Sequence, residues 1–322
     1  MASTDVPSAA AAVEAASLAF LNATTAQERS TAEAALLEMR RWPQPLPLCH
    51  HLLVHSTVGY AKLQALYMAR ECLGAQWHAL TPAERGELQN LFLRLQTDGA
   101  EQYVRAAAAQ MLAVHAKHDV LHTPPPPVGS SSTPPDAAIA ALLHSATQML
   151  EDPSAARAPA AIDLLHALLG EFGAPSSGAA GGSLAWSMHA RARASFQEHH
   201  LLPVFQIGLR HLQRLAEPAV TAPPPLAPPL VKSLTLCASL LTMSLSWDFD
   251  GVGEAAAATD TRPGLNASVV RPPASNGASW RAVLGHSGLL AAVGATEAHP
   301  VPRSPIVLSA QISHVLSAQI SH

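Results

Sequence analysis

Apolar residues in the first half of the chain recur at helical spacing, and this periodicity limits the fold more than any other feature. One stripe, at positions i, i+3, i+4 and i+7 of a predicted helix, consists of Leu88, Leu91, Phe92 and Leu95. Thr81 and Glu84 precede it at the spacing of a capping box, in which each side chain bonds a backbone amide of the other residue. Thr25 and Glu28 repeat this pattern earlier in the chain. Both segments therefore predict the start of a helix.

Taken in order, the predicted helices form pairs. They lie near 8–22 and 26–41, 46–56 and 58–76, 82–96 and 100–118, and 136–151 and 154–172. Successive pairs are spaced by about forty residues, the period of HEAT or armadillo-like helix pairs. Because one pair cannot bury both of its faces, neighbouring pairs stack and share a continuous core. We predict an all-α fold, an α-α superhelix of such pairs; a bundle of unrelated helices would give the same stripes.

Segments rich in proline, glycine or serine interrupt the helices and divide the chain. Residues 123–135 form a Pro/Ser-rich linker, 173–183 a Gly/Ser/Ala loop and 217–229 a second Pro-rich linker. Between the last two, residues 184–215 predict two helices that meet near His199-His200-Leu201. The chain then comprises helix-pair repeats over 1–122, the first linker, further helix pairs over 136–247 and a tail over 248–322.

The tail is rich in alanine, glycine and proline, and we expect it to be mostly disordered with one short helix near 280–290. It ends in a tandem repeat, because VLSAQISH occurs at 307–314 and again at 315–322. We interpret this repeat as an artefact of the coding sequence, either a spurious extension or a truncation. A genuine low-complexity tail is the alternative.

The composition agrees with helices and excludes several classes of partner. Apolar residues reach 48% but aromatic residues only 4%, so the core must consist largely of leucine, alanine, valine and methionine. With 19 basic and 23 acidic residues, the chain lacks the basic excess of proteins that bind nucleic acids or anionic membranes. Cys49, Cys72 and Cys237 form no CxxC pattern, which indicates a reducing compartment. We therefore expect an intracellular protein with no nucleic-acid partner.

Nothing in the sequence predicts secretion or insertion into a membrane. The N-terminus carries Asp5 and Glu14 and lacks the basic region of a signal peptide. The most apolar stretch, Leu230 to Trp247, is interrupted by Lys232 and by serine and threonine residues. It therefore predicts a buried helix of a soluble protein and not a membrane span.

The seventeen histidines raise the question of a metal site. His115, His118 and His122 are spaced to share one helix end, but zinc needs three or four converging ligands, commonly with cysteine or carboxylate among them. Asp119 lies near this group, and no cysteine does. We predict packed or solvated histidines and no bound metal.

Motifs of catalysis are also missing from the sequence. Residues 285–288, GHSG, resemble G-x-S-x-G only superficially, and neither a P-loop nor a dinucleotide fingerprint occurs. We predict no catalytic residue, no cofactor and no enzymatic activity.

Arginine and tryptophan residues have structural as well as functional interpretations. Two arginine-containing clusters, 39–42 and 189–193, fit either contact with an acidic partner or solvated helix ends. The tryptophans that we predict to anchor the packing between helices are Trp77, Trp186, Trp247 and Trp280.

Several stretches of sequence resemble nuclear transport receptors. Residues 32–77, which begin AEAALLEMRRW and end RECLGAQW, resemble the N-terminal region of importin-β-type receptors, as does EQYVRAAAAQMLAVHAKHDVL at 101–121. Stretches similar to the exportin-4 family follow in the family's order: LLHALLGEF at 164–172, SMHARARASFQEHHLLPVFQIGLRHLQ at 187–213, LSWDF at 245–249 and SWRAVL at 279–284. The chain is thus similar to the N-terminal part of that family.

The resemblance implies a receptor that binds Ran in its GTP form and carries proteins from the nucleus to the cytoplasm. The implied cargo is a hypusine-containing translation factor or a Smad-type protein, and import is a further implied activity. Contact with nuclear pore proteins is implied as well, with residence in the nucleus, the cytoplasm and the nuclear pore complex. Family members are several times longer, so most of the repeats that grip cargo are expected outside this chain.

In such receptors the second helix of each early repeat lines the face that grips Ran. Here these helices are the ones predicted over 26–41, 58–76 and 100–118. The candidate Ran-binding residues on them are Arg29, Lys62, Gln64, Arg70 and Arg105. Three apolar or aromatic residues of the middle helix, predicted to lie in the core, are Leu63, Leu66 and Tyr67.

Two alternatives remain open at this point. One is an α-solenoid scaffold for protein–protein interaction without Ran dependence, which the helix-pair pattern supports equally. The other concerns cargo alone, because exportin-7-like receptors form a related branch with a different choice of cargo.

Overall fold

The structure, a computed structural model, describes residues 5–42, 45–97, 101–122, 137–152, 156–173, 186–221 and 227–247. All regular elements within these ranges are helices, as predicted. They are α1 (Val6–Asn22), α2 (Ala26–Met39), α3 (Pro45–His55), α4 (Gly59–Gln76), the 3-10 helix η1 (Trp77–Ala79), α5 (Pro82–Thr97), α6 (Gln102–His122), α7 (Ala137–Glu151), α8 (Ala158–Gly173), α9 (Trp186–His199), α10 (Leu201–Thr221) and α11 (Pro228–Leu245). The linker predicted over 123–135, most of the loop over 173–183 and the tail over 248–322 lie outside the described residues.

The observed helices follow the predicted pairs closely, with two differences of about one turn. Helix α6 continues to His122, whereas the prediction ended it at residue 118. Helix α8 begins at Ala158 rather than at residue 154. The two helices predicted over 184–215 are α9 and α10, which adjoin at His200.

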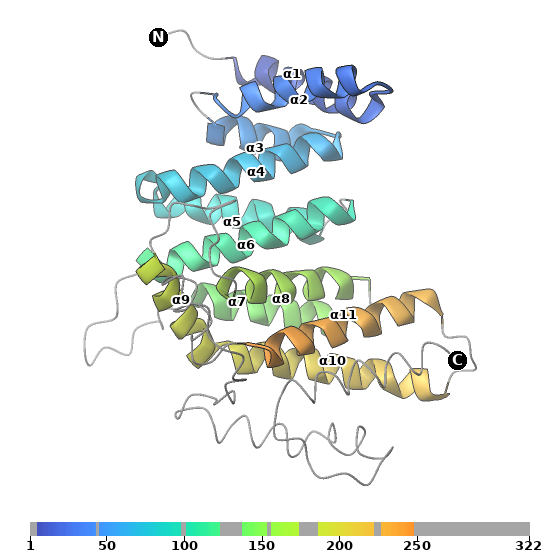
Figure 1. The fold of residues 1–322 in the computed structure, drawn as a ribbon. Helices are drawn as coiled ribbons and strands as arrows, with labels where there is room; N and C mark the ends of the chain where they lie inside the picture. The colour runs from blue at the N-terminus through green and yellow to red at the C-terminus, as the bar shows by residue number, and fades with distance from the viewer. Residues whose placement is uncertain are drawn as a thin grey trace, which may run out of the picture. The chain divides into compact units, whose positions relative to one another are not determined.

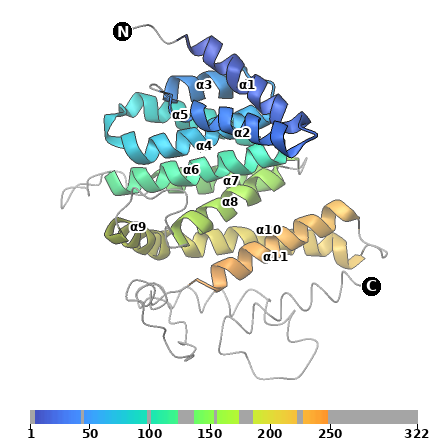
Figure 2. The same cartoon turned by 45° about the horizontal axis from the view of Figure 1, so that its top comes forward.

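The chain divides into two compact units. Unit 1 contains α1 to α6 with residues 186–188, and unit 2 contains α7, α8, the remainder of α9, α10 and α11. In unit 1 the helices form three hairpins, α1/α2, α3/α4 and α5/α6. Figures 1 and 2 show these hairpins stacked in chain order. This is the arrangement of HEAT-like repeats, in which each hairpin buries its faces against its neighbours.

The row of hairpins in unit 1 has two kinds of contact. The first helices pack in sequence, α1 on α3 and α3 on α5, while the second helices α4 and α6 pack on each other. The apolar stripe predicted on α5 is buried among them; its members are Leu88, Leu91, Phe92 and Leu95. The helical periodicity of the sequence thus selects the side of α5 that enters the core.

Two helices of unit 1 begin with the capping boxes that the sequence predicts. The amide of Glu28 donates to Thr25 Oγ1 at 3.2 Å, and the amide of Thr25 donates to Glu28 Oε2 at 3.0 Å. Glu84 and Thr81 exchange the equivalent bonds of 3.3 and 2.7 Å at the start of α5. The backbone amides favour the charged carboxylates and so lower the pKa of both glutamates. Each box satisfies amides that the helix itself leaves free.

In unit 2 the hairpins are α7/α8 and α10/α11, and α8 also packs on α11. The predicted bounds of the second Pro-rich linker, 217–229, are wrong at both ends, because α10 continues through Thr221 and α11 already begins at Pro228. Prolines are compatible with the first turn of α11, since the amides of a first turn have no partner within the helix.

Helix α11 is the most apolar helix among the described residues that is also long enough to cross a membrane. Its 18 residues have a mean hydropathy of 1.2, and 39% of them are buried. The buried residues lie on one side, where α11 packs on α10 and α8, and include Leu234, Cys237, Leu240, Leu241 and Leu245. A core helix with one packed side has this pattern, in agreement with the predicted buried helix.

Helices α10 and α11 approach each other closely at Gly208. A Cβ atom at this position would lie 2.8 Å from Leu240 Cδ2 and 3.3 Å from Leu241 Cδ2, and both leucines are fully buried. We expect Gly208→Ala to lower the free energy of unfolding by about 1–3 kcal/mol, because the packed leucines must move. Urea unfolding followed by circular dichroism measures this loss.

Gly170→Ala, in α8 of the same unit, is the matched control. A Cβ atom there meets only Met243 Cε, at an ordinary contact distance of 3.8 Å. This variant should be neutral or more stable by up to about 1 kcal/mol, because alanine favours a helix over glycine. Equal stability of the two alanine variants would contradict the close approach of α10 and α11.

Candidate partner-binding face

The second helices of unit 1 run parallel to one another. Near their starts, the Tyr103 hydroxyl and the Glu101 carboxylate lie so close to Gly59 of α4 that a Cβ atom there would overlap both. Near their ends, Trp77 packs on His115 and His118 of α6, with ring centroids 4.9 and 5.1 Å apart. Because the N-terminal ends of α4 and α6 are in contact and their C-terminal ends are in contact as well, the two helices are parallel.

Helix α2 joins this layer in the same direction. Phe20, at the end of α1, stacks on Tyr60, at the start of α4, with centroids 5.0 Å apart and ring planes 2° from parallel. The Arg29 guanidinium carbon, near the start of α2, lies 6.0 Å from the Phe20 centroid. Helix α2 therefore starts beside the start of α4. We call the solvent-exposed side of α2, α4 and α6 the second-helix face.

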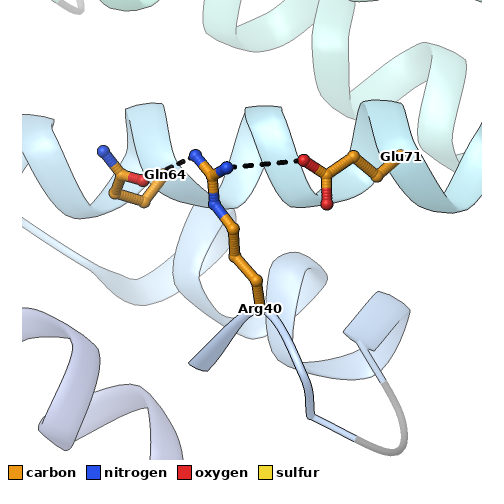
Figure 3. A network of polar contacts seen from close by, with 3 residues as sticks. All are labelled: Arg40, Gln64 and Glu71. Carbon is orange, nitrogen blue, oxygen red and sulfur yellow. Dashed lines mark hydrogen bonds and ion pairs between the residues drawn. The ribbon is translucent and has the colours of Figure 1, made fainter. Parts of the chain in front are cut away.

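Arg40 joins the end of α2 to the middle of α4 (Figure 3). Its Nη2 donates to Gln64 Oε1 at 3.4 Å, and its Nη1 pairs with Glu71 Oε1 at 3.5 Å. Gln64 and Glu71 are two turns apart on one side of α4, and the guanidinium lies between them. This bridge holds α2 against α4, although an ion pair this exposed contributes only about 0–1 kcal/mol.

The five candidate Ran-binding residues differ in exposure. Arg29 is exposed, whereas Lys62, Arg70 and Arg105 are half-buried. Gln64 is only 9% exposed, and its side-chain oxygen already accepts the hydrogen bond from the bridging arginine. The structure therefore does not support direct contact between Gln64 and a partner. The other four side chains are at least partly accessible to solvent.

Two tyrosines of the second-helix face were not among the predicted contacts. Tyr67 is 40% exposed, so the prediction that it lies in the core is wrong, while Leu66 beside it is buried as predicted. Leu63 is half-buried. Tyr67 shares its side of α4 with Arg70, three positions further on. On α6, Tyr103 is 45% exposed. Exposed tyrosine and arginine side chains are the types most often found at the centre of protein interfaces.

Comparison with known proteins places this chain in a family. A family model described as Exportin-4 matches residues 8–284, which is most of the chain. The chain belongs to the exportin-4 family. Exportins are transport receptors of the karyopherin type, and the resemblance found in the sequence is confirmed.

A curated relative shows how much of a family member the chain represents. The protein described as Exportin-4 from Dictyostelium discoideum is 25% identical over 202 residues. These residues make up 61% of this chain and 18% of that protein. The chain thus spans less than a fifth of the length of this relative.

In this exportin-4 family chain, a buried aromatic cluster closes the end of α4 against α5 and α6. Trp77 is 1% exposed, and the Arg85 guanidinium carbon lies 4.7 Å from its ring centroid. Arg85 Nη2 also donates to the Trp77 carbonyl oxygen at 3.0 Å, and His115 Nε2 lies 3.0 Å from the Arg85 carbonyl oxygen. Trp77 is therefore a packing anchor, as predicted. Of the other tryptophans predicted as anchors, Trp247 is buried in unit 2, and the side chains of Trp186 and Trp280 lie outside the described residues.

The histidines of this cluster are packed groups. Burial lowers the pKa of His115 and of His118 to about 4, and nearby positive charges, Arg85 for the first and His122 and Lys117 for the second, act in the same direction. Both rings are therefore neutral at physiological pH. Within the described ranges, no group of three or more His, Cys, Asp or Glu residues is placed to hold a metal ion.

The three cysteines are buried as free thiols. Burial raises the pKa of Cys72 to about 11 and that of Cys237 to about 12, and it raises the pKa of Cys49 further still. The thiolate is the nucleophilic form of cysteine, so these groups are unreactive near neutral pH.

The two arginine-containing clusters are largely engaged within the chain. In the first, Arg41 pairs with Glu38 at 2.8 Å, and Arg40 forms the bridge to α4. In the second, Arg193 is 6% exposed, and its guanidinium carbon lies 5.1 Å from the Trp247 ring centroid. Arg193 fits neither of the two predicted interpretations, a solvated helix end or contact with an acidic partner. Its guanidinium forms a cation–π contact with a buried ring, which is a packing contact within unit 2.

Proposed function

We propose that this chain binds Ran in its GTP form through the second-helix face and forms the Ran-binding N-terminal region of a nuclear export receptor. The observation that carries the proposal is membership of the exportin-4 family over residues 8–284. The geometry of unit 1 supports it, since α4 and α6 run parallel and pack on each other, and α2 runs in the same direction and is bridged to α4 by Arg40. The charged residues of these helices that we propose as contacts are Arg29, Lys62, Arg70 and Arg105, which are exposed or half-buried.

The proposal includes cargo and pore contacts as properties of the whole family protein. The cargo would be a hypusine-containing translation factor or a Smad-type protein, and nuclear pore proteins would be further partners. The receptor would then move between the nucleus and the cytoplasm and pass through the nuclear pore complex. Because the chain covers 18% of the relative from Dictyostelium, these properties require tests on a family protein of full length.

The direct test compares the two nucleotide states of Ran. We expect the purified chain to bind Ran loaded with a non-hydrolysable GTP analogue at least about tenfold more tightly than Ran loaded with GDP, which corresponds to about 1.4 kcal/mol. Biolayer interferometry on immobilised Ran measures both affinities. Equal affinity, or no binding of either form by the folded chain, would overturn the proposal. Nucleotide-independent binding of other proteins would instead favour the scaffold alternative.

Paired variants locate the site on unit 1. Tyr67→Ala and Arg70→Glu each remove a partly exposed side chain of the second-helix face and should weaken binding of the GTP form by about tenfold, as expected for interface residues of these types. Arg94→Glu is the control, because Arg94 is exposed on α5, a first helix of the same unit. Its affinity should match that of the unmodified chain. A loss in Arg94→Glu equal to that in Arg70→Glu would indicate a general charge effect.

A further inference from the structure

Unit 2 contains a cleft between the end of α7 and the middle of α10. Its volume is about 390 Å³, within the range of about 300–1,000 Å³ that is typical of ligand pockets. Leu150 from α7 and Ile207 from α10 line it and are buried, so part of the wall is apolar. Thr147, also from α7, adds a hydroxyl group.

The charged groups of this cleft are mainly basic. Arg210 and Arg214 line it from α10 and are exposed, and Glu151 lines it from α7. The arginines are four positions apart and therefore neighbours on one side of α10. Within the described residues, Arg210 and Glu151 form no hydrogen bond or ion pair, and the one hydrogen bond of the Arg214 side chain is to His211. The arginines and Glu151 are thus not neutralising one another.

His211 orients one of the two arginines. Its Nδ1 lies 3.5 Å from Arg214 Nη2, and the histidine is buried. Burial, with the adjacent Arg214 charge, lowers the pKa of His211, so the ring stays neutral and Nδ1 can accept a hydrogen bond from the guanidinium. The Arg214 side chain is therefore oriented by a hydrogen bond within the chain, whereas the Arg210 guanidinium can bind a ligand.

We propose that this cleft binds a short acidic peptide segment of a partner protein. The carboxylates of the segment would pair with Arg210 and Arg214, because an arginine guanidinium binds a carboxylate through two parallel hydrogen bonds. Apolar side chains next to the carboxylates would contact Leu150 and Ile207. The Glu151 carboxylate repels an acidic segment. Removal of the arginine charges should therefore weaken binding of the segment, whereas removal of the Glu151 charge should strengthen it. The proposal concerns unit 2 and does not depend on Ran binding by unit 1.

The test uses a short fluorescein-labelled peptide of the repeated unit Glu-Glu-Leu-Gly, with Gln-Gln-Leu-Gly as its neutral counterpart. Fluorescence anisotropy on the whole chain should show that the acidic peptide binds at least about tenfold more tightly than the neutral one at low salt. Arg210→Gln with Arg214→Gln should remove this difference, whereas Glu151→Gln should strengthen acidic-peptide binding by about two- to threefold. Arg157→Gln, at an exposed arginine before α8, should change nothing.

The outcomes separate a built site from a general basic surface. Equal affinity for the two peptides, or a double variant that binds like the unmodified chain, would overturn the proposal. The proposal would also be overturned if heparin bound more tightly than the acidic peptide and if Arg157→Gln reduced heparin binding as much as the double variant does. That result would indicate nonspecific attraction of polyanions. Because every substituted residue is exposed, circular dichroism should show unchanged folding in all variants. Affinity for Ran in its GTP form should stay the same in the double variant.

Discussion

Replacing Trp77 by alanine will lower the free energy of unfolding of unit 1 by about 3–5 kcal/mol, the range seen for large aromatic residues removed from cores. The side chain is 1% exposed and joins three elements of unit 1. It stacks on the His118 ring at 5.1 Å, and the Arg85 guanidinium carbon lies over it at 4.7 Å. Alanine leaves a cavity between these groups and removes the cation–π contact. Urea unfolding followed by far-ultraviolet circular dichroism measures the loss.

Two further variants separate packing from the simple loss of an aromatic ring. Tyr67→Ala, at the exposed tyrosine of α4, should cost no more than about 1 kcal/mol, as surface substitutions do. Trp77→Phe should cost less than alanine, because it keeps a ring and removes the Trp77 Nε1 donor, which is buried without a hydrogen-bond partner in the described structure. If Trp77→Ala and Tyr67→Ala were equally stable, Trp77 would not be the anchor of the α4–α6 contact.

Acidification will destabilise unit 1 as the pH falls from about 6.5 towards 4.5. His115 and His118 have a pKa near 4 in the folded chain, against 6.5 for a solvated histidine. Below pH 6.5 the unfolded chain binds protons that the folded chain does not, so the stability is complete above pH 6.5 and falls with the pH. Each group contributes a loss of up to about 1.4 kcal/mol per pH unit in this interval. The charged or titratable groups near the two histidines are Arg85, Lys117, His78 and His122.

The pH profile of the urea midpoint tests this expectation. His118→Phe keeps a ring on Trp77 but cannot be protonated, so its profile should be about half as steep as that of the unmodified chain. His144→Phe, at an exposed histidine of α7, should leave the slope unchanged. The capping glutamates Glu28 and Glu84, whose pKa is lowered, lose their contribution only at more acidic pH. A flat profile, or the full slope in His118→Phe, would show that these histidines are protonated equally in both states.

Much of unit 1 could be predicted because local signals agree with the fold. The capping boxes at Thr25 and Thr81 start α2 and α5 in the structure, and the stripe that begins at Leu88 is the buried side of α5. These features depend on residues within one or two turns of each other, which a sequence displays directly. The period of the helix pairs then limits how neighbouring hairpins stack.

Side chains whose position depends on distant residues were less predictable. The sequence predicts Tyr67 in the core beside Leu66, but α4 packs on several helices and has apolar residues on most sides, so its apolar pattern does not single out the exposed side. One local signal does indicate exposure of Tyr67. Arg70 and Glu71 follow it by three and four positions, so two charged residues lie on the same side of α4 as Tyr67. The bridge from Arg40 to Gln64 joins residues 24 positions apart, and no local pattern reports such a contact.

Hydroxyl-radical footprinting with Ran tests the central claim most directly, because the exposed apolar and aromatic residues of unit 1 report on different faces. Tyr67 and Tyr103 lie on the second helices, whereas Leu21 lies on α1 and Val54 on α3, and all are at least 40% exposed. Ran in its GTP form should reduce oxidation of the two tyrosines by about threefold or more, as burial in an interface does. It should leave Leu21 and Val54 unchanged, and Ran with GDP should protect none of them. Protection of Leu21 and Val54 instead, or the same pattern with both nucleotides, would contradict a Ran-binding second-helix face.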